Sequence, residues 1–381
     1  MPTGIWRGVI KLQGQELPFN FEVVENGEDK VKLILINASE RLNVDDVVIK
    51  GDSLYINMPL FDSRIQAKIS GNKLTGNFIK NYVKDYNLPF EATHGIEYRF
   101  KEGKGSPEFV AKKFKVQFAD DADSIYTVGL FNQNGNKLTG TILTTTGDHR
   151  YLDGMVERDS LFLSAFDGEH AYLYKGKIYP DSSLTGKYWS GKGYNTTFKA
   201  IPNDTIELPD VNKITYLKPG YEKLTFSFPG LNGEHVSLHD SKYKNKVVII
   251  QLLGSWCPNC MDETMFLAPW YKKNKSRGVE VIGLAYEKKD DFKYAKERVQ
   301  RMKDRLNVTY DLAIAGTSDK ASASKSLPML NSVLAFPTTI FIDKDGKVRK
   351  IHTGFSGPGT GIYYEKFVEE FNGTVDKLLA E

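Results

Sequence analysis

Cys257 and Cys260 are the only two cysteines in the 381 residues, and they form one C-x-x-C motif. They follow Val247–Leu253, a run of apolar residues interrupted only by Gln251. Such a run predicts a strand that is buried on both faces. A C-x-x-C motif behind it indicates a redox dithiol, half of a zinc site, or a chance spacing.

A structural zinc ion normally takes four ligands, and no further cysteine is available to complete the set. His235 and His239 are the best remaining candidates. On a strand, residues four apart lie roughly 13 Å from each other, too far to hold one ion. The spacing therefore favours the redox dithiol, and we expect neither a metal nor a cofactor.

The two cysteines are predicted to have different roles. A strand that ends at Leu253 and a helix that begins at Pro258 place Cys257 at the helix N-terminus. Unpaired backbone N–H groups and the helix dipole favour the reactive thiolate there, and proline suits the first helical turn. Cys257 is then the attacking thiol, and Cys260, one turn further on and screened, resolves the mixed disulfide.

Release of the Cys260 proton requires an acceptor near the pair. Glu263 is a candidate, since it lies on the same predicted helix. The alternative is a solvated carboxylate that only interacts favourably with the helix dipole.

Phe336-Pro337 precedes a short apolar run at Thr339–Asp343. Proline cannot donate to a β-ladder, so Pro337 indicates a strand start, a bulge or a cis bond. The spacing does not choose among these three.

The C-terminal elements alternate between strands and helices, which predicts a mixed α/β sheet. A hairpin precedes the first buried strand. The predicted strands are Val279–Ala285, Thr339–Asp343 and Val348–His352, and the predicted helices are Cys260–Lys273, Asp290–Arg305 and Tyr364–Leu379, the last broken near Asn372-Gly373. The first helix is expected to turn Met261, Met265, Phe266 and Trp270 inward. The second is expected to turn Phe292, Ala295, Val299 and Met302 inward.

Residues 1–205 contain short alternating runs separated by turn signals, which predicts an all-β, antiparallel sandwich or barrel. Asp52-Ser53-Leu54 recurs as Asp159-Ser160-Leu161, and Leu74-Thr75-Gly76 recurs as Leu184-Thr185-Gly186. Two related units, near 1–105 and 106–205, would produce this pattern, and so would common hairpin vocabulary. We assign this half no chemistry, because its histidines have no partners at a spacing typical of a catalytic site.

Residues 206–223 are predicted to be a linker, since they carry two prolines and mixed charge, and the redox domain is then 224–381. A net charge of +3 gives no argument for nucleic acid as a partner. No apolar run is long enough to span a membrane, and the N-terminus lacks the pattern of a signal peptide.

From Leu224 onward the chain resembles the thioredoxin fold, in particular its TlpA/ResA-like cell-envelope branch. Two motifs carry the resemblance, Trp256-Cys257-Pro258-Asn259-Cys260 and Phe336-Pro337-Thr338-Thr339. The resemblance implies that Pro337 is cis, lies against the cysteines and offers backbone to a substrate peptide. It implies that Trp256, Pro258, Asn259 and Phe336 line the substrate site, and that Glu263 tunes the dithiol.

The chain departs from the thioredoxin pattern at two positions. Gln251 stands where thioredoxin has a buried aspartate, so the proton route falls to Glu263, to water or to neither. Met265 stands where a helix proline is common, and Pro269 follows four residues later, which suggests a displaced kink.

The leading hypothesis is a reductase of protein disulfides in the periplasm or cell envelope, whose targeting segment is absent from this chain. Its partners would be disulfide-bonded proteins and an upstream reductant. A peroxiredoxin-like peroxidase is an alternative, although Gly254 occupies the position of the threonine that this family needs. A ligand-binding or partner-binding protein with a redox-sensing dithiol is another. The sequence sets neither the redox direction nor the oligomeric state.

Overall fold

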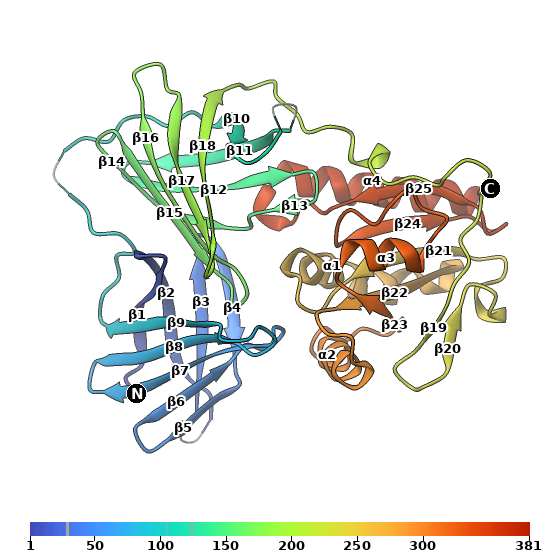
Figure 1. The fold of residues 1–381 in the computed structure, drawn as a ribbon, viewed down its shortest axis with the longest axis horizontal. Coiled ribbons are helices and arrows are strands. Elements are labelled where there is room, and N and C mark those ends of the chain that lie inside the picture. The colour runs from blue at the N-terminus through green and yellow to red at the C-terminus, as the bar shows by residue number, and fades with distance from the viewer. Residues whose placement is uncertain (28–29, 104, 123–124) are drawn as a thin grey trace. The chain divides into compact units, whose positions relative to one another are not determined.

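The computed structural model describes the whole chain except residues 28–29, 104 and 123–124 (Figure 1). The chain divides into two compact units. The first contains Met1–Thr144 and His149–Glu207, and the second contains Thr145–Asp148 and Leu208–Glu381. The boundary at Glu207 falls inside the predicted linker, and the segment Thr145–Asp148 groups with the second unit. The predicted domain limits themselves stay predictions.

The first unit begins with an antiparallel nine-stranded sheet in the order β4-β3-β2-β1-β9-β8-β7-β6-β5. Its strands are β1 (Gly4–Leu12), β2 (Gln15–Glu25), β3 (Val31–Asn37), β4 (Glu40–Val44), β5 (Val47–Lys50), β6 (Ser53–Asn57), β7 (Ser63–Ser70), β8 (Lys73–Lys80) and β9 (Asn87–His94). Apart from β4 and β5, each strand pairs with the next along the chain, and β9 returns to β1.

A second antiparallel sheet completes this unit, and it closes on itself. Its order is β11-β10-β18-β17-β16-β15-β14-β12, and β11 also pairs with β12. The strands are β10 (Lys113–Phe118), β11 (Thr127–Asn134), β12 (Lys137–Thr144), β14 (Leu152–Glu157), β15 (Ser160–Phe166), β16 (Ala171–Ile178), β17 (Leu184–Ser190) and β18 (Tyr194–Pro202). The all-β prediction is confirmed. Both sheets form hairpin meanders whose last strand pairs with the first, and the internal repeat stays a prediction.

The aromatic side chains of the closed sheet form its core. Tyr174 and Tyr188 stack with ring centroids 4.4 Å apart, and the His149 ring lies 4.9 Å from that of Tyr172. Burial lowers the pKa of His149 to about 3, so this ring is neutral at physiological pH. Ring stacking and a hydrogen bond between His149 Nδ1 and Tyr174 Oη therefore hold these side chains together.

The second unit is built on a five-stranded mixed sheet in the order β23-β22-β21-β24-β25 (Figure 1). Its strands are β21 (Val247–Leu253), β22 (Val279–Glu287), β23 (Asp311–Thr317), β24 (Thr338–Ile342) and β25 (Val348–Thr353). β21, β22 and β23 are parallel, whereas β24 and β25 are antiparallel to their neighbours. The mixed α/β prediction is confirmed, and all seven residues of the central strand β21 are buried.

Four α-helices and one hairpin surround this sheet. They are α1 (Pro258–Asn274), α2 (Phe292–Arg305), α3 (Lys320–Ser326), α4 (Ile362–Ala380), and the strands β19 (Ser227–Pro229) and β20 (His235–Ser237). The ring of Phe371 on α4 contacts Phe266 and Trp270 of α1 and Phe341 of β24. This aromatic cluster fixes α1, and therefore the cysteines at its start, against the sheet.

Three details differ from the predicted helices. Met265 and Phe292 are exposed: Met265 lies on the same outer face of α1 as the exposed Pro269, four residues further on, and Phe292 is the first residue of α2. The predicted break near Asn372-Gly373 is wrong, since α4 is continuous. Phe367, Phe371, Val375 and Leu378 bury one face of α4, and this packing outweighs the low helix propensity of one glycine. Among the described residues, none of the helices is long and apolar enough to cross a bilayer.

Candidate redox site

Cys257 is the N-cap residue of α1. Its Sγ accepts a hydrogen bond from the backbone N–H of Cys260 at 3.3 Å, and it can donate to the carbonyl of Phe336 at 3.3 Å. An N-cap acceptor satisfies one of the four N–H groups that have no partner within a helix. Pro258 occupies the first helical position, where its missing N–H costs nothing. The sulfur therefore stands where the helix end favours negative charge.

Both cysteines are free, and both are buried: Cys257 is 5% exposed and Cys260 is 0% exposed. Burial raises the pKa of the Cys260 thiol well above its ordinary value, and the neighbouring Cys257 and Glu263 raise it further. Cys260 is thus a neutral thiol that needs a proton acceptor before it can react.

Phe336 and Pro337 lie across the site from α1. Their peptide bond is cis, as the resemblance implied. The Phe336 ring meets the Trp256 ring edge-on at 6.0 Å, and the Pro337 carbonyl accepts from the N–H of Gly354 at 2.9 Å. The structure thus brings Trp256, Cys257, Phe336 and Pro337 together from two segments far apart in the sequence.

The Trp256 indole is held at two points. Its Nε1 donates to the carbonyl of Tyr286 at 2.8 Å, and Lys288 Nζ lies 3.5 Å from the ring centroid, a cation–π contact. Trp256 is part-buried, so its side chain keeps some contact with solvent.

Glu263 is completely buried, at 0% exposed, and is not a solvated carboxylate. Gln251 Nε2 donates to its Oε2 at 2.7 Å, and the Thr339 hydroxyl donates to its Oε1. Burial raises the pKa of Glu263 to about 7, although the hydrogen bonds from Thr339 and Gln251 oppose the rise. A carboxylate with a pKa near neutrality can both accept and release a proton at physiological pH.

The Glu263 environment depends on strand register. Gln251 of β21 pairs with Thr339 of β24, so both side chains point to the same face, where α1 presents Glu263. Tyr310 Oη also donates to Gln251 Oε1 at 3.3 Å. Gln251 therefore connects the buried acid to a polar network.

A second buried acid, Glu287, was not predicted. Its carboxylate accepts from the N–H of Ser255 at 2.7 Å and from the Ser255 hydroxyl at 2.8 Å. Burial raises the pKa of Glu287. Glu287 ends β22, so it anchors the loop that carries Trp256 and Cys257. An acid directly after the apolar run 281–286 was the available signal.

Asn259 is buried, and its amide nitrogen donates to Asp148 Oδ2 at 3.3 Å and to the Phe355 carbonyl at 3.5 Å. No chemistry was predicted for residues 1–205, whereas Asp148 reaches the C-x-x-C motif. No local pattern around Asp148 could have indicated this contact, since 111 positions separate the two residues.

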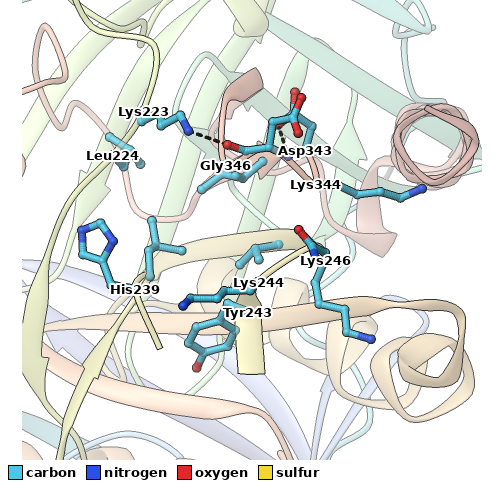
Figure 2. A pocket seen from close by; sticks show the side chains of 14 residues that line it. Lys223, Leu224, His239, Tyr243, Lys244, Lys246, Asp343, Lys344 and Gly346 are labelled. Atoms are coloured by element: carbon cyan, nitrogen blue, oxygen red, sulfur yellow. Dashed lines mark hydrogen bonds between the residues drawn. The ribbon is translucent and has the colours of Figure 1, made fainter. Parts of the chain in front are cut away.

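A hollow of about 420 Å³ lies away from the dithiol, where β21 begins (Figure 2). Lys223, Lys244, Lys246 and Lys344 line it together with Asp343 and Asp345. Lys223 Nζ donates to the Asp345 carbonyl at 2.6 Å, as Figure 2 shows. The mixed charges and open solvent contact point to no particular ligand. Among the described residues, no group of three His, Cys, Asp or Glu side chains is arranged to hold a metal ion.

A strand that ends in a C-x-x-C helix, with a cis-proline facing it, defines a thioredoxin-like domain of the thiol-disulfide oxidoreductase class. Residues 207–365 match the family model described as Redoxin, so the C-terminal part of the chain carries a redoxin domain.

Two curated relatives are thiol-disulfide oxidoreductases named ResA. The protein from Halalkalibacterium halodurans is 28% identical over 156 residues, which are 40% of this chain and 75% of the relative. The protein from Bacillus thuringiensis subsp. konkukian is 32% identical over 129 residues, which are 34% of this chain and 66% of the relative, just under two thirds. The chain therefore has thiol-disulfide oxidoreductase homologues for its second unit.

The comparison with solved structures finds a thiol:disulfide interchange protein of the thioredoxin family from Chlorobium tepidum. It is 19% identical, covers 42% of this chain and 95% of that chain, and has a TM-score of 0.32. A likeness at this level carries no argument about substrate or partner.

Proposed function

We propose that this protein reduces disulfide bonds in protein substrates through Cys257 and Cys260. The observation that carries the proposal is the position of the Cys257 sulfur at the N-cap of α1, with the fully buried Cys260 one turn behind it. A helix N-terminus favours negative charge, and burial keeps the Cys260 thiol protonated until an acceptor is ready.

In the first step, the Cys257 thiolate attacks one sulfur of the substrate disulfide. A bond forms between Cys257 and that sulfur, and the other substrate sulfur leaves as a thiolate and takes up a proton. Trp256, Pro258, Phe336 and the backbone at Pro337 hold the substrate chain in this mechanism, whereas Asn259 is buried and bonded to Asp148. The rings of Trp256 and Phe336 beside the dithiol support this.

In the second step, Cys260 loses its proton and attacks the Cys257 sulfur. The Cys257–Cys260 disulfide forms, and the second substrate sulfur leaves, so the substrate gains two electrons and the protein loses two. Glu263 is proposed to accept the Cys260 proton, because its pKa of about 7 lets it be ionised when needed. An upstream dithiol then returns the protein to its reduced form.

The test is reduction of an insulin-type disulfide substrate by the wild type, Cys257→Ala and Cys260→Ala. We expect Cys257→Ala to abolish the reaction, and Cys260→Ala to accumulate a mixed disulfide that reductant releases. Asn274→Ala at the far end of α1 is a control that should remain active. Full activity of Cys257→Ala would contradict the proposal and favour a binding protein with a redox-sensing dithiol.

We further propose that the protein works outside the cytoplasm, on the strength of its resemblance to the TlpA/ResA-like branch. Fractionation of cells that express the full-length gene tests this. Recovery of the protein with cytoplasmic markers would reject the location without rejecting the chemistry.

A further inference from the structure

The segment Thr145–Asp148, which includes the short strand β13 (Gly147–Asp148), belongs to the redox unit although the residues on both sides of it belong to the other unit. Glycines permit a close approach here. A Cβ on Gly354, whose φ is +79°, would lie 2.9 Å from the carbonyl of Thr145. A Cβ on Gly147 would lie 2.8 Å from the amide nitrogen of Asn259. The backbone of this segment therefore packs directly on the redox site.

Asp148 is the polar anchor of the segment. It is 4% exposed, and its Oδ2 accepts from the N–H of Gly357 at 2.7 Å and from Asn259 Nδ2 at 3.3 Å. Asn259 is the second residue of α1, so the Asp148 carboxylate stands at the same helix end as the Cys257 sulfur. Asp262 faces the same glycine, with Oδ2 at 3.1 Å from where a Cβ of Gly357 would be.

A carboxylate at a helix N-terminus interacts with the same partial positive charge that stabilises a thiolate there, and it repels the thiolate. A dithiol whose reduced form is stabilised as the thiolate is a stronger oxidant, so a nearby negative charge makes the dithiol more reducing.

We propose that Asp148 is a positioning residue of the redox centre: it fixes Asn259 and the Gly357 backbone, and its negative charge keeps the Cys257–Cys260 couple reducing. This inference rests on the proposed thiol-disulfide exchange. It gives the segment Thr145–Asp148 a part in setting the redox direction.

The test is equilibration of the full chain with mixtures of reduced and oxidised glutathione, for the wild type and Asp148→Asn. Asparagine can still accept from Gly357 but carries no charge. We expect the equilibrium to shift about tenfold toward the reduced dithiol, which for a two-electron couple is about 30 mV toward more oxidising potential. Alkylation of Cys257 at fixed neutral pH should be faster in the same variant.

Glu369→Gln is the matched control, because it removes one exposed negative charge from α4. An Asp148→Asn shift no larger than that of Glu369→Gln would overturn the inference. Gly147→Ala is a second variant, which keeps the Asp148 carboxylate but moves it away from Asn259. This variant should shift the redox equilibrium in the same direction as Asp148→Asn. If Asp148→Asn does not fold, an unshifted equilibrium in Gly147→Ala overturns the inference. A wild type that forms no Cys257–Cys260 disulfide would instead reject the proposed function.

Discussion

Gln251 Nε2 donates to Glu263 Oε2 over 2.7 Å, and both side chains are fully buried. Gln251 takes the strand position at which thioredoxin has its buried aspartate, yet the site still contains a buried acid. That acid comes from the helix, one turn after the second cysteine. Gln251 thus supports the acid as a hydrogen-bond donor.

Glu263→Gln should change how stability depends on pH. The pKa of Glu263 is about 7 in the folded protein and 4.5 in its ordinary range, so the folded state binds more protons between these values. Its stabilising contribution is therefore complete below about pH 4.5 and is lost as the pH rises through about 7. At 1.36 kcal/mol per unit, the loss is about 3 kcal/mol.

The measurement is urea unfolding of the reduced wild type and Glu263→Gln at several pH values, followed by a probe in the second unit such as hydrogen exchange of α1. The wild type should lose stability relative to the variant as the pH rises, because only Glu263 ionises. The Gln251 amide can rotate to bond a glutamine partner, so the variant keeps this hydrogen bond. If the stabilities of the two proteins changed in parallel with pH, the pKa of Glu263 would be the same in the folded and unfolded states.

Glu263 should also set the pH dependence of the second chemical step. Resolution of the mixed disulfide should accelerate as the pH rises through about 7, because only the ionised carboxylate accepts the Cys260 proton. Glu263→Gln should flatten this profile and slow resolution by at least about tenfold. Single-turnover decay of a preformed mixed disulfide measures this step. Alkylation of Cys257 in Glu263→Gln should keep the wild-type rate. If both the decay and the alkylation were slower, the substitution would have distorted the whole site.

Gln251→Leu tests the hydrogen bond that Gln251 donates to Glu263. The substitution leaves Glu263 Oε2 and Tyr310 Oη without this partner, which costs about 1–3 kcal/mol for each buried group. The pKa of Glu263 should rise, because the Gln251 hydrogen bond lowers it. The midpoint of the pH–rate profile should then move upward, while Ile250→Leu on the same strand should leave it in place. An unmoved midpoint in Gln251→Leu would refute the role of this hydrogen bond.

Glu287→Ala should loosen the loop that carries the attacking cysteine. It removes the acceptor for the Ser255 N–H and hydroxyl, at a cost of about 1–3 kcal/mol for each buried donor left unpaired. We expect faster hydrogen exchange at the Ser255 amide and slower disulfide reduction. Ser255→Ala loses only the hydroxyl bond and should have the smaller effect; equal effects of the two substitutions would mean that the backbone contact contributes nothing.

The local pattern around the dithiol was informative because its signals are short-range. An apolar run interrupted only by Gln251 predicted β21 residue for residue, and the proline after Cys257 predicted the start of α1. Helix edges were less well predicted. The predicted apolar stripes did not show that Met265 lies on the outer face of α1, or that Phe292 at the first position of α2 is left uncovered.

The chemistry could be predicted from the residues alone, because a C-x-x-C pair lies at a strand-to-helix junction in a mixed α/β unit that follows an all-β half. The groups that surround this pair became apparent only from the folded chain. Thr339 meets Glu263 across 76 positions and Asp148 meets Asn259 across 111 positions. Periodicity and capping act over one or two turns, whereas these contacts arise from strand register and from backbone packed against glycine, which no local pattern encodes.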